Sequence, residues 1–221
     1  NKMEELITEI KEDHRGATVF FDGGEKLWLS RSMLREQNLQ VDEAFDIDTL
    51  KAWLLPRQYP EALNRAVGLL AMRGHSEGEL RQKLTVAQYM DDTVEMVIYK
   101  LQKENLLNDE AFARSWAAAR ARKQLGKYRI MQELLSKGIA HELAKRVVDE
   151  LPIDESNEQA NALAIKLLRR YQDEDARKAM QKLIAAMARR GYGFADARNA
   201  AEHALACMRQ ENAEDEDGDE P

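Results

Sequence analysis

The sequence predicts a mainly α-helical protein: three tandem three-helix, helix-turn-helix-like repeats in an elongated curved array, preceded by a small N-terminal module that contains a β-hairpin. Its composition is typical of packed, well-solvated helices, because 33% of its 221 residues are charged and only 6% are aromatic, with 4 Pro and 11 Gly. From residue 61 on, apolar residues recur at helical spacing. Candidate first helices start near Glu61, Asp109 and Asn157, which gives a period of 48 residues. A period of this length is typical of stacked repeats that bury their apolar faces on one another.

The N-terminal module, residues 1–56, differs from the rest in its apolar pattern. Ala17–Phe21 and Lys26–Ser30 have the composition of strands and flank Asp22–Glu25, whose glycines suit a hairpin turn. The other elements expected here are a strand at Leu6–Ile10, a short helix at Arg31–Glu36 and a helix from Asp48 to about Pro56. Pro56 and Pro60 are predicted to bracket a linker to the repeats.

The helical repeats are predicted to span residues 61–107, 108–154 and 155–209. The second and third helices expected in them cover 77–88 and 91–104, 127–137 and 140–151, and 175–190 and 194–208. Ser76 and Glu79 have the spacing of a capping box, which marks the start of a helix. Gly126, Gly138 and Gly191 lie where we expect helices to end.

The net charge of -7 is distributed unevenly along the chain. Residues 61–210 carry 25 basic and 21 acidic side chains, whereas residues 211–221 carry seven acidic and no basic ones. Such an acidic end is typical of a disordered tail, which we place at 210–221. It is either a solubilising end or an electrostatic shield for a basic surface. The acidic net charge therefore does not argue against an anionic partner.

The sequence contains no motif that indicates an enzyme, a metal site or a cofactor. His203 and Cys207 lie four residues apart on an expected helix, but two ligands do not make a closed zinc site. Ser76 is explained by capping, and no carboxylate pair lies in an apolar setting suited to acid–base catalysis. The single cysteine excludes an internal disulfide and is typical of a reducing compartment. No apolar run reaches the ~20 residues of a membrane span, and no signal-peptide core is present, so we expect a cytoplasmic protein without membrane contact.

Residues 111–132 have the most unusual charge pattern in the chain. This window contains six basic residues and no acidic one, in a chain that is richer in acids than in bases. The six are Arg114, Arg120, Arg122, Lys123, Lys127 and Arg129. On ideal helices they surround a helix–turn–helix corner at Gly126. Two interpretations stay open: a solvated surface whose cations pair with acids elsewhere, or a patch that binds phosphate backbones or an acidic protein groove.

Two blocks of sequence resemble the RecX family of bacterial regulatory proteins. The first is similar to the family pattern Arg-x-x-Ser-Glu-x-Glu-Leu-x-x-Lys-Leu and reads Arg73-Gly74-His75-Ser76-Glu77-Gly78-Glu79-Leu80-Arg81-Gln82-Lys83-Leu84. The second comprises Leu106-Leu107-Asn108-Asp109-Glu110-Ala111-Phe112-Ala113, then Arg120, Gly126, Ile130, Glu133-Leu134 and Lys137-Gly138-Ile139. The resemblance covers Glu61 to about Leu151 and extends to the third repeat by pattern; the N-terminal module and the acidic end lie outside this shared core. The chain departs from the family at Gln88, where a glycine commonly precedes the third helix, and at Gly74-His75, where a second basic residue is frequent.

The resemblance implies a non-enzymatic regulator of the RecA recombinase, acting in recombination, DNA repair and the SOS response. Such a protein, expected here as a monomer, binds the RecA–single-stranded-DNA filament in its groove and inhibits strand exchange, ATP turnover or filament growth. The positions expected to contact RecA or the DNA are the six cations of the window together with Arg73, Arg81 and Lys83. The residues expected in the module cores are Leu80, Leu84, Phe112, Trp116, Ile130 and Leu134. The alternatives are a stand-alone protein that binds duplex DNA through its helix-turn-helix-like modules, and a generic helical scaffold.

Overall fold

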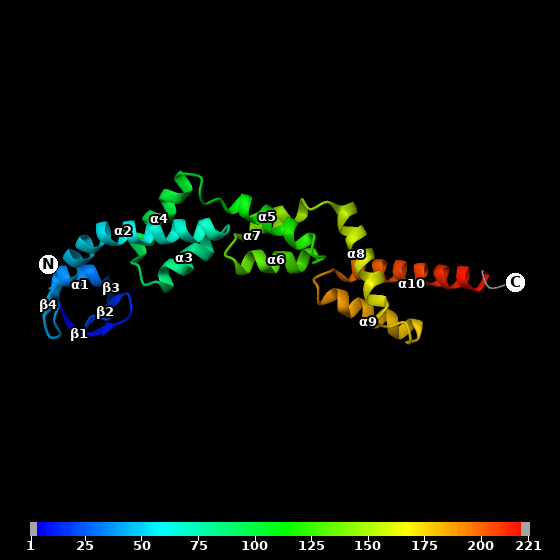
Figure 1. The fold of residues 1–221 in the computed structure, drawn as a ribbon, viewed down its shortest axis with the longest axis horizontal. Coiled ribbons are helices and arrows are strands. Elements are labelled where there is room, and N and C mark those ends of the chain that lie inside the picture. The colour runs from blue at the N-terminus through cyan, green and yellow to red at the C-terminus, as the bar shows by residue number, and fades with distance from the viewer. Residues whose placement is uncertain (1–3, 218–221) are drawn as a thin grey trace. The chain divides into compact units, whose positions relative to one another are not determined.

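The computed structural model describes residues 4–217, except for the side chains of residues 153–156 and 211–217. The chain divides into two compact units, Asn1–Asn108 and Asp109–Pro221 (Figure 1). The first unit holds the N-terminal module and the first three-helix repeat, called repeat 1. The second unit holds repeats 2 and 3.

The N-terminal module is built on a four-stranded antiparallel sheet. Its strands are β1 (Glu4–Glu12), β2 (Gly16–Phe21), β3 (Lys26–Ser30) and β4 (Ala44–Asp46), in the spatial order β3-β2-β1-β4. The predicted hairpin is confirmed, because Val19 pairs with Leu27 and Gly24 in the turn has a φ of 90°. The short helix α1 (Arg31–Gln37) follows, as predicted. The sequence did not predict β4, since a three-residue strand carries too little alternation to be recognised.

Helix α2 (Ile47–Met72) joins this module to repeat 1, and the predicted linker at Pro56 and Pro60 is wrong. Both prolines lie inside one continuous helix of 26 residues. They are four residues apart, so the amide that Pro60 lacks is the one that would have bonded to Pro56. The first half of α2 packs on the sheet through Leu50 and Leu54, and the second half places Ala62 in the core of repeat 1. One helix therefore serves two cores and leaves no room for a linker.

Buried residues of β3 and α2 also tie the module to repeat 1. Leu27 and Leu29 point into the core of the sheet, whereas Trp28, on the opposite face of the strand, packs in the core of repeat 1. The buried amide of Gln58 donates to the Trp28 carbonyl at 2.8 Å, and its oxygen accepts from the Met90 amide at 3.0 Å. The N-terminal module and repeat 1 thus form one folded unit.

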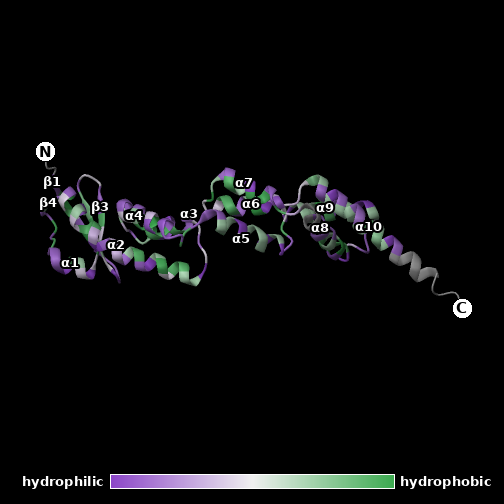
Figure 2. Ribbon diagram, turned by 90° about the horizontal axis from the view of Figure 1, so that it is seen from above, coloured by the Kyte–Doolittle hydropathy of each residue, from purple (hydrophilic) through white to green (hydrophobic). Residues whose placement is uncertain are grey.

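The helices of the three repeats fall close to their predicted positions. Repeat 1 continues with α3 (Glu77–Val86) and α4 (Asp91–Lys103), repeat 2 consists of α5 (Asp109–Ala121), α6 (Lys127–Ser136) and α7 (His141–Asp149), and repeat 3 consists of α8 (Ile153–Leu168), α9 (Ala176–Ala188) and α10 (Phe194–Asp217). These helices carry both apolar and polar residues along their length (Figure 2). The predicted core residues Leu80, Leu84, Ile130 and Leu134 are fully buried. Phe112 and Trp116 are only partly buried at the edge of their core.

The second helix of every repeat ends in the same backbone motif. A residue in the left-handed conformation follows each helix: Gln88 (φ 68°), Gly138 (φ 79°) and Gly191 (φ 87°). The next residue is buried, and its amide bonds to the carbonyl five residues earlier: Tyr89 to Leu84 at 3.3 Å, Ile139 to Leu134 at 3.1 Å and Tyr192 to Met187 at 3.3 Å. This is a Schellman motif. Its recurrence identifies the three repeats as one structural unit, and Gln88 adopts the conformation that glycine adopts in the other two.

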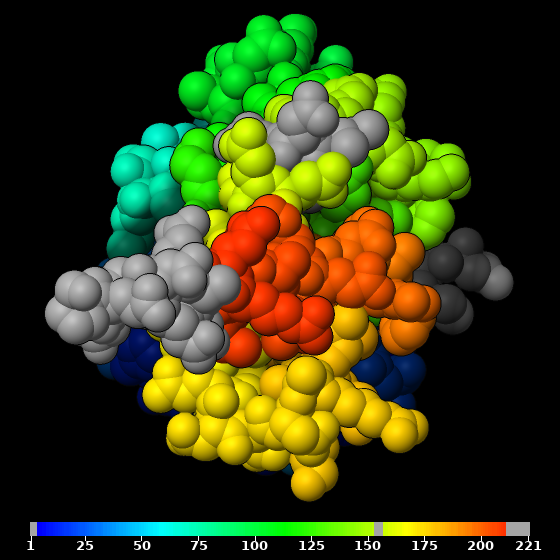
Figure 3. Space-filling view, turned by 90° about the vertical axis from the view of Figure 1, so that its right-hand side faces the viewer, coloured from blue at the N-terminus to red at the C-terminus, as the bar shows by residue number. Residues whose placement is uncertain are grey.

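Helix α10 differs from the prediction at its C-terminal end. It packs against α9, with Leu183 and Ala201 in one core, and the two helices adjoin in Figure 3. The sequence predicts a disordered tail over 210–221, but the backbone stays helical to Asp217. No glycine or proline stands before Gly218 to stop the helix. The side chains beyond Gln210 lie outside the described residues, as do residues 218–221, so the two interpretations of the acidic end stay open.

Candidate partner-binding surface

The predicted basic corner is the turn between α5 and α6 of repeat 2. The turn that follows α5 contains a left-handed residue, Gln124 (φ 56°). The amide of the next residue, Leu125, donates to the Arg120 carbonyl at 3.2 Å. The sequence predicts that Gly126 ends the first helix of repeat 2, and this prediction is wrong. Gly126 is the N-cap of α6. No side chain caps this N-terminus, and the first turn of α6 contains no acidic residue.

Repeat 3 closes this N-terminus instead. The Gly126 amide donates to the Arg190 carbonyl at 2.9 Å, and the Tyr128 amide donates to the Gly191 carbonyl at 3.1 Å. The approach requires glycine, because a Cβ on Gly126 would lie 2.2 Å from the Gly191 oxygen. The end of α9 thus fixes the backbone of the basic corner.

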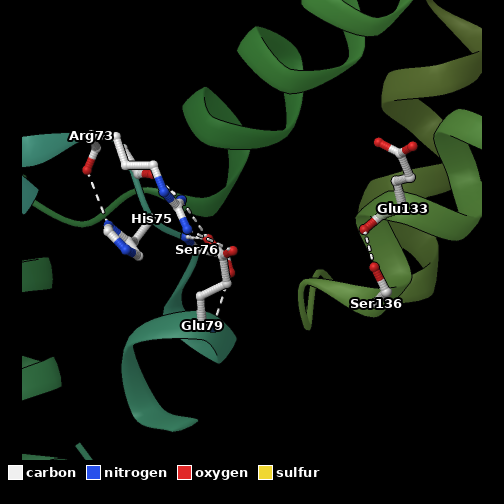
Figure 4. A network of polar contacts seen from close by, with 7 residues as sticks. Arg73, His75, Ser76, Glu79, Glu133 and Ser136 are labelled. Atoms are coloured by element: carbon white, nitrogen blue, oxygen red, sulfur yellow. Dashed lines mark hydrogen bonds and ion pairs between the residues drawn. The ribbon is translucent and has the colours of Figure 1, made fainter. Parts of the chain in front are cut away.

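Glu133 organises one side of the corner. One of its carboxylate oxygens accepts from Arg120 Nε at 2.7 Å and from Trp116 Nε1 at 3.1 Å, and the other lies 3.4 Å from Arg129 Nε. The Arg120 guanidinium also lies over the Trp116 ring, 4.1 Å from its centroid, and Lys137 Nζ lies 4.0 Å from the same centroid. Arg120 therefore positions Trp116 and is not a free cation. Figure 4 shows Glu133 on α6, with its backbone carbonyl accepting from the Ser136 hydroxyl at 2.8 Å.

Arg114 is also paired. It bonds to Glu110, one turn earlier, at 2.9 Å, and to Glu150 at the end of α7. Arg146 lies 3.2 Å from the same Glu110. The hydrogen bond from Arg114, and next the charge of Arg146, lower the pKa of Glu110 below its ordinary value. This exposed network joins α5 to α7.

Three of the six window cations remain: Arg122, Lys123 and Lys127, called here the corner cations. Among the side chains that the structure describes, no carboxylate lies within ion-pair distance of them. Arg122 and Lys123 are exposed, and Lys127 is half-buried. The window lacks acids in the sequence, but Glu110, Glu133 and Glu150 reach it from outside. The i, i+4 spacing of Arg129 and Glu133 was the signal that sequence reasoning missed.

In repeat 1, the predicted contact residues serve mainly to hold the start of α3. The capping box is confirmed: the Glu79 amide donates to the Ser76 hydroxyl at 3.1 Å, and the Ser76 amide donates to the Glu79 carboxylate. Arg73 binds the same carboxylate through two nitrogens, at 3.0 and 3.1 Å. The Arg73 carbonyl accepts from the ring nitrogen Nδ1 of buried His75 at 3.0 Å (Figure 4). Burial lowers the pKa of His75, so this ring is neutral at pH 7.

The other two predicted contacts in repeat 1 differ from each other. Arg81 bonds to Glu77 at 2.6 Å and to Glu95 on α4, and these hydrogen bonds raise its pKa. Lys83 is exposed, and no ion pair links it to any described acidic side chain. Of the nine predicted positions, the structure therefore leaves four without an acidic partner among the described side chains: Arg122, Lys123, Lys127 and Lys83.

The other candidate chemistry is sparse. His203 Nε2 and Cys207 Sγ lie 3.6 Å apart on α10. Within the described residues, no group of three or more His, Cys, Asp or Glu side chains has the arrangement of a metal site. No helix in the described part of the chain is both long enough and apolar enough to span a membrane.

The fold and the corner define a tandem three-helix repeat protein with a basic turn in its second repeat. Three family models match it in order: the first three-helix domain of RecX over residues 62–101, the second over 108–148 and the third over 154–200. A regulatory protein RecX of Prosthecochloris aestuarii is 35% identical over 133 residues, covering 60% of this chain and 85% of the relative. The chain belongs to the RecX family, a family of regulatory proteins.

The relatives also show how far the similarity extends. A regulatory protein RecX of Clostridioides difficile is 28% identical over 193 residues, covering 86% of this chain and 91% of the relative. Residues 62–221 make up less than three quarters of the chain, so this match reaches into the N-terminal module, which the sequence alone had placed outside the shared core. A crystal structure titled regulatory protein RecX has the same fold, with a TM-score of 0.62, 23% identity, and coverage of 91% of this chain and 99% of that one.

Proposed function

We propose that this chain binds the RecA–single-stranded-DNA filament in its groove and inhibits its recombinase, ATPase and filament-growth activities, with the corner cations as the main contacts. Membership in a family of regulatory proteins supports a regulatory role without a catalytic step. The observation that carries the proposal is the set of three neighbouring cations, Arg122, Lys123 and Lys127, that lack a carboxylate partner among the described side chains.

Unpaired cations are better suited to an anionic partner than paired ones. A cation that already bonds to a carboxylate must lose that bond before it contacts a phosphate, which cancels much of the gain. A cation without a carboxylate partner loses no ion pair when it binds a nucleic-acid backbone and releases the counterions of that backbone. The corner cations therefore contribute most of the affinity, and the exposed Lys83 contributes in repeat 1.

The paired arginines have secondary roles in this proposal. Arg114 and Arg129 keep about half of their side-chain surface exposed and can exchange a carboxylate for a phosphate. Arg120 is less exposed and holds Trp116 and Glu133, so it is a positioning residue. Arg73 and Arg81 stabilise the ends and packing of α3, so their loss affects folding before binding.

The geometry of α6 disfavours the alternative of a stand-alone protein that binds duplex DNA. A recognition helix inserts its N-terminal end into the major groove. In this chain, the backbone of Arg190 and Gly191 bonds to that end of α6. Repeat 3 occupies the approach that a base-reading contact requires.

The test is a triple charge reversal, Arg122→Glu, Lys123→Glu and Lys127→Glu, in the full chain. We expect the variant to need about tenfold more protein, or still more, to inhibit the RecA ATPase on single-stranded DNA, because three attractive contacts become repulsive. The matched control reverses three exposed cations of repeat 3, Lys166, Arg169 and Arg170, and changes the net charge equally. Thermal melting monitors the fold of both variants.

Three outcomes decide between these possibilities. A loss of inhibition that is confined to the corner variant supports the proposal. Equal inhibition by the corner variant and the wild type, with both folded, refutes the assignment of the corner. If the wild-type chain does not inhibit RecA at all, the proposed function itself is wrong.

A further inference from the structure

A small cavity lies beside the corner cations in the second unit. Its volume is about 240 Å³, and its walls include Ala118, Ala121, Leu125 and Leu151. Arg122 and Lys127 line it as well. The cavity therefore combines apolar walls with two of the three corner cations.

The size of the cavity restricts what it can hold. Small-molecule and cofactor sites usually have volumes of about 300 to 1,000 Å³. An apolar cavity of about 150 Å³ already accepts a benzene-sized group. A cavity of about 240 Å³ fits one large apolar side chain better than a whole cofactor.

The charges indicate what should stand next to that side chain. A cation beside an apolar cavity favours a carboxylate on the segment that enters it, since the pair is then partly shielded from water. Large side chains that fill well-packed pockets usually contribute most of the affinity between proteins.

We propose that the cavity docks a peptide segment of the partner protein, which inserts one large apolar side chain and places an Asp or Glu beside Arg122 and Lys127. This inference rests on the proposed function, since the partner protein is then the RecA recombinase itself. It assigns the cavity to contact with the recombinase protein and leaves Lys123, which does not line it, for the DNA.

Nucleic acid is the less suitable occupant. Unpaired bases bind mainly by stacking on aromatic rings, and none of the described residues that line the cavity is aromatic. A phosphate group can contact Arg122 and Lys127, but it makes no favourable contact with the alanine and leucine walls of the cavity. Protein is therefore the class of partner that the lining favours.

The experiment fills the cavity with Ala121→Leu, and in a second variant with Ala118→Leu. Ser115→Leu is the control, because it adds a leucine to an exposed position of the same helix that does not line the cavity. We expect each filling variant to reduce inhibition of the RecA ATPase, and binding to DNA-free RecA, about tenfold, with unchanged affinity for a single-stranded oligonucleotide. Hydrogen exchange on the wild-type chain provides a readout without a variant. DNA-free RecA should slow exchange at the amides of Leu151 and Gln159, which line the cavity outside the turn that carries Lys123, and the oligonucleotide alone should not.

The readouts distinguish the two proposals. If the wild type inhibits RecA and both folded filling variants inhibit equally well, the cavity proposal is wrong and the proposed function stands. If filling the cavity weakens oligonucleotide binding in parallel, or if the oligonucleotide alone protects the amides of Leu151 and Gln159, the cavity belongs to a DNA surface and the proposal is also overturned. If the wild type inhibits nothing, both fail.

Discussion

The second helix of repeat 1 and the second helix of repeat 2 occupy equivalent places but begin in different ways. α3 is closed by its own residues: Ser76 and Glu79 form a capping box, and Arg73 binds the Glu79 carboxylate. At the equivalent positions α6 has Gly126 as N-cap and Arg129 in place of the acid. Its open amides bond to backbone carbonyls of repeat 3.

This difference explains where unpaired charge accumulates. The two acids in the first turn of α3, Glu77 and Glu79, bind the neighbouring Arg81 and Arg73. The start of α6 needs no acid, because a neighbouring repeat satisfies its amides. Without an acid in that turn, Arg122, Lys123 and Lys127 have no carboxylate partner among the described side chains. Closure by backbone rather than by side chains thus leaves three cations without a described acidic partner at one corner, whereas the side-chain closure of α3 pairs its neighbouring arginines.

The largest expected effect comes from breaking the closure of repeat 2 with Gly191→Ala. The new Cβ would lie 2.3 Å from Arg129 Cβ and 2.4 Å from its backbone nitrogen, at a position with a φ of 87°. We expect a loss of about 2 to 4 kcal/mol in the stability of the second unit. Hydrogen exchange should show faster opening at the amides of Gly126 and Tyr128, with the start of α3 unaffected.

Gly24→Ala is the control for this variant. Gly24 has a nearly identical φ of 90°, but nothing lies within 4 Å of a Cβ placed there. This variant suffers only the left-handed strain, about 1 to 2 kcal/mol. Equal losses at Gly24 and Gly191 would show that the close approach between repeats 2 and 3 contributes nothing.

The two helix starts also show how much of the fold the sequence predicts. A capping box is a local signal within four residues, so Ser76 and Glu79 were recognisable, as were the hairpin and the 48-residue period. The contact between Gly126 and Gly191 joins residues far apart in the chain, and no local pattern reports it. The continuous helix through Pro56 and Pro60 was missed for the same reason, because its two halves pack on cores that only the tertiary structure defines.

The candidate site was predictable only in part. The acid-free window located the turn between α5 and α6, but only three of its six cations lack an acidic partner among the described side chains. Glu133 pairs with Arg120 and Arg129, so these two arginines are not unpaired cations. Glu133 lies one residue beyond the acid-free window, residues 111–132. A helical net of i, i+4 pairs identifies the partner of Arg129, whereas the partner of Arg114 on α7 requires the folded repeat.

A smaller effect is expected from breaking the closure of repeat 1 with Ser76→Ala. The variant loses the hydroxyl that accepts from the Glu79 amide, which costs about 1 kcal/mol at a typical N-cap. Exchange at the first turn of α3 should accelerate, while α6 stays protected. Ser136→Ala is the control, since its exposed hydroxyl bonds only to a carbonyl in its own helix and should change stability by less than about 0.5 kcal/mol. An equal change at the two serines would contradict the capping role.

The smallest expected effect is a difference in pH dependence between the starts of α3 and α6. His75 lies in the local closure of repeat 1, whereas the equivalent residue of repeat 2 is the apolar Leu125. Burial lowers the pKa of His75, so the folded chain binds fewer protons than the unfolded chain, in which a histidine titrates near pH ~6.5. The contribution of neutral His75 to the stability of the fold is therefore complete above a pH of about 6.5. It is lost as the pH falls from there toward the lower pKa that His75 has in the folded chain.

Exchange at the start of α3, corrected for intrinsic rates, should accelerate between pH 7.5 and 5.5, and exchange at the start of α6 should not. His75→Gln should flatten this dependence, because the side chain no longer titrates, while the exposed His141→Gln should leave it in place. If α3 and α6 respond to acid alike, or if His141→Gln has the same effect as His75→Gln, the pH response does not arise from the closure of repeat 1. A response confined to α3 would show that protonation of His75 weakens the side-chain closure of repeat 1. The backbone closure of repeat 2 contains no such titrating group and stays intact.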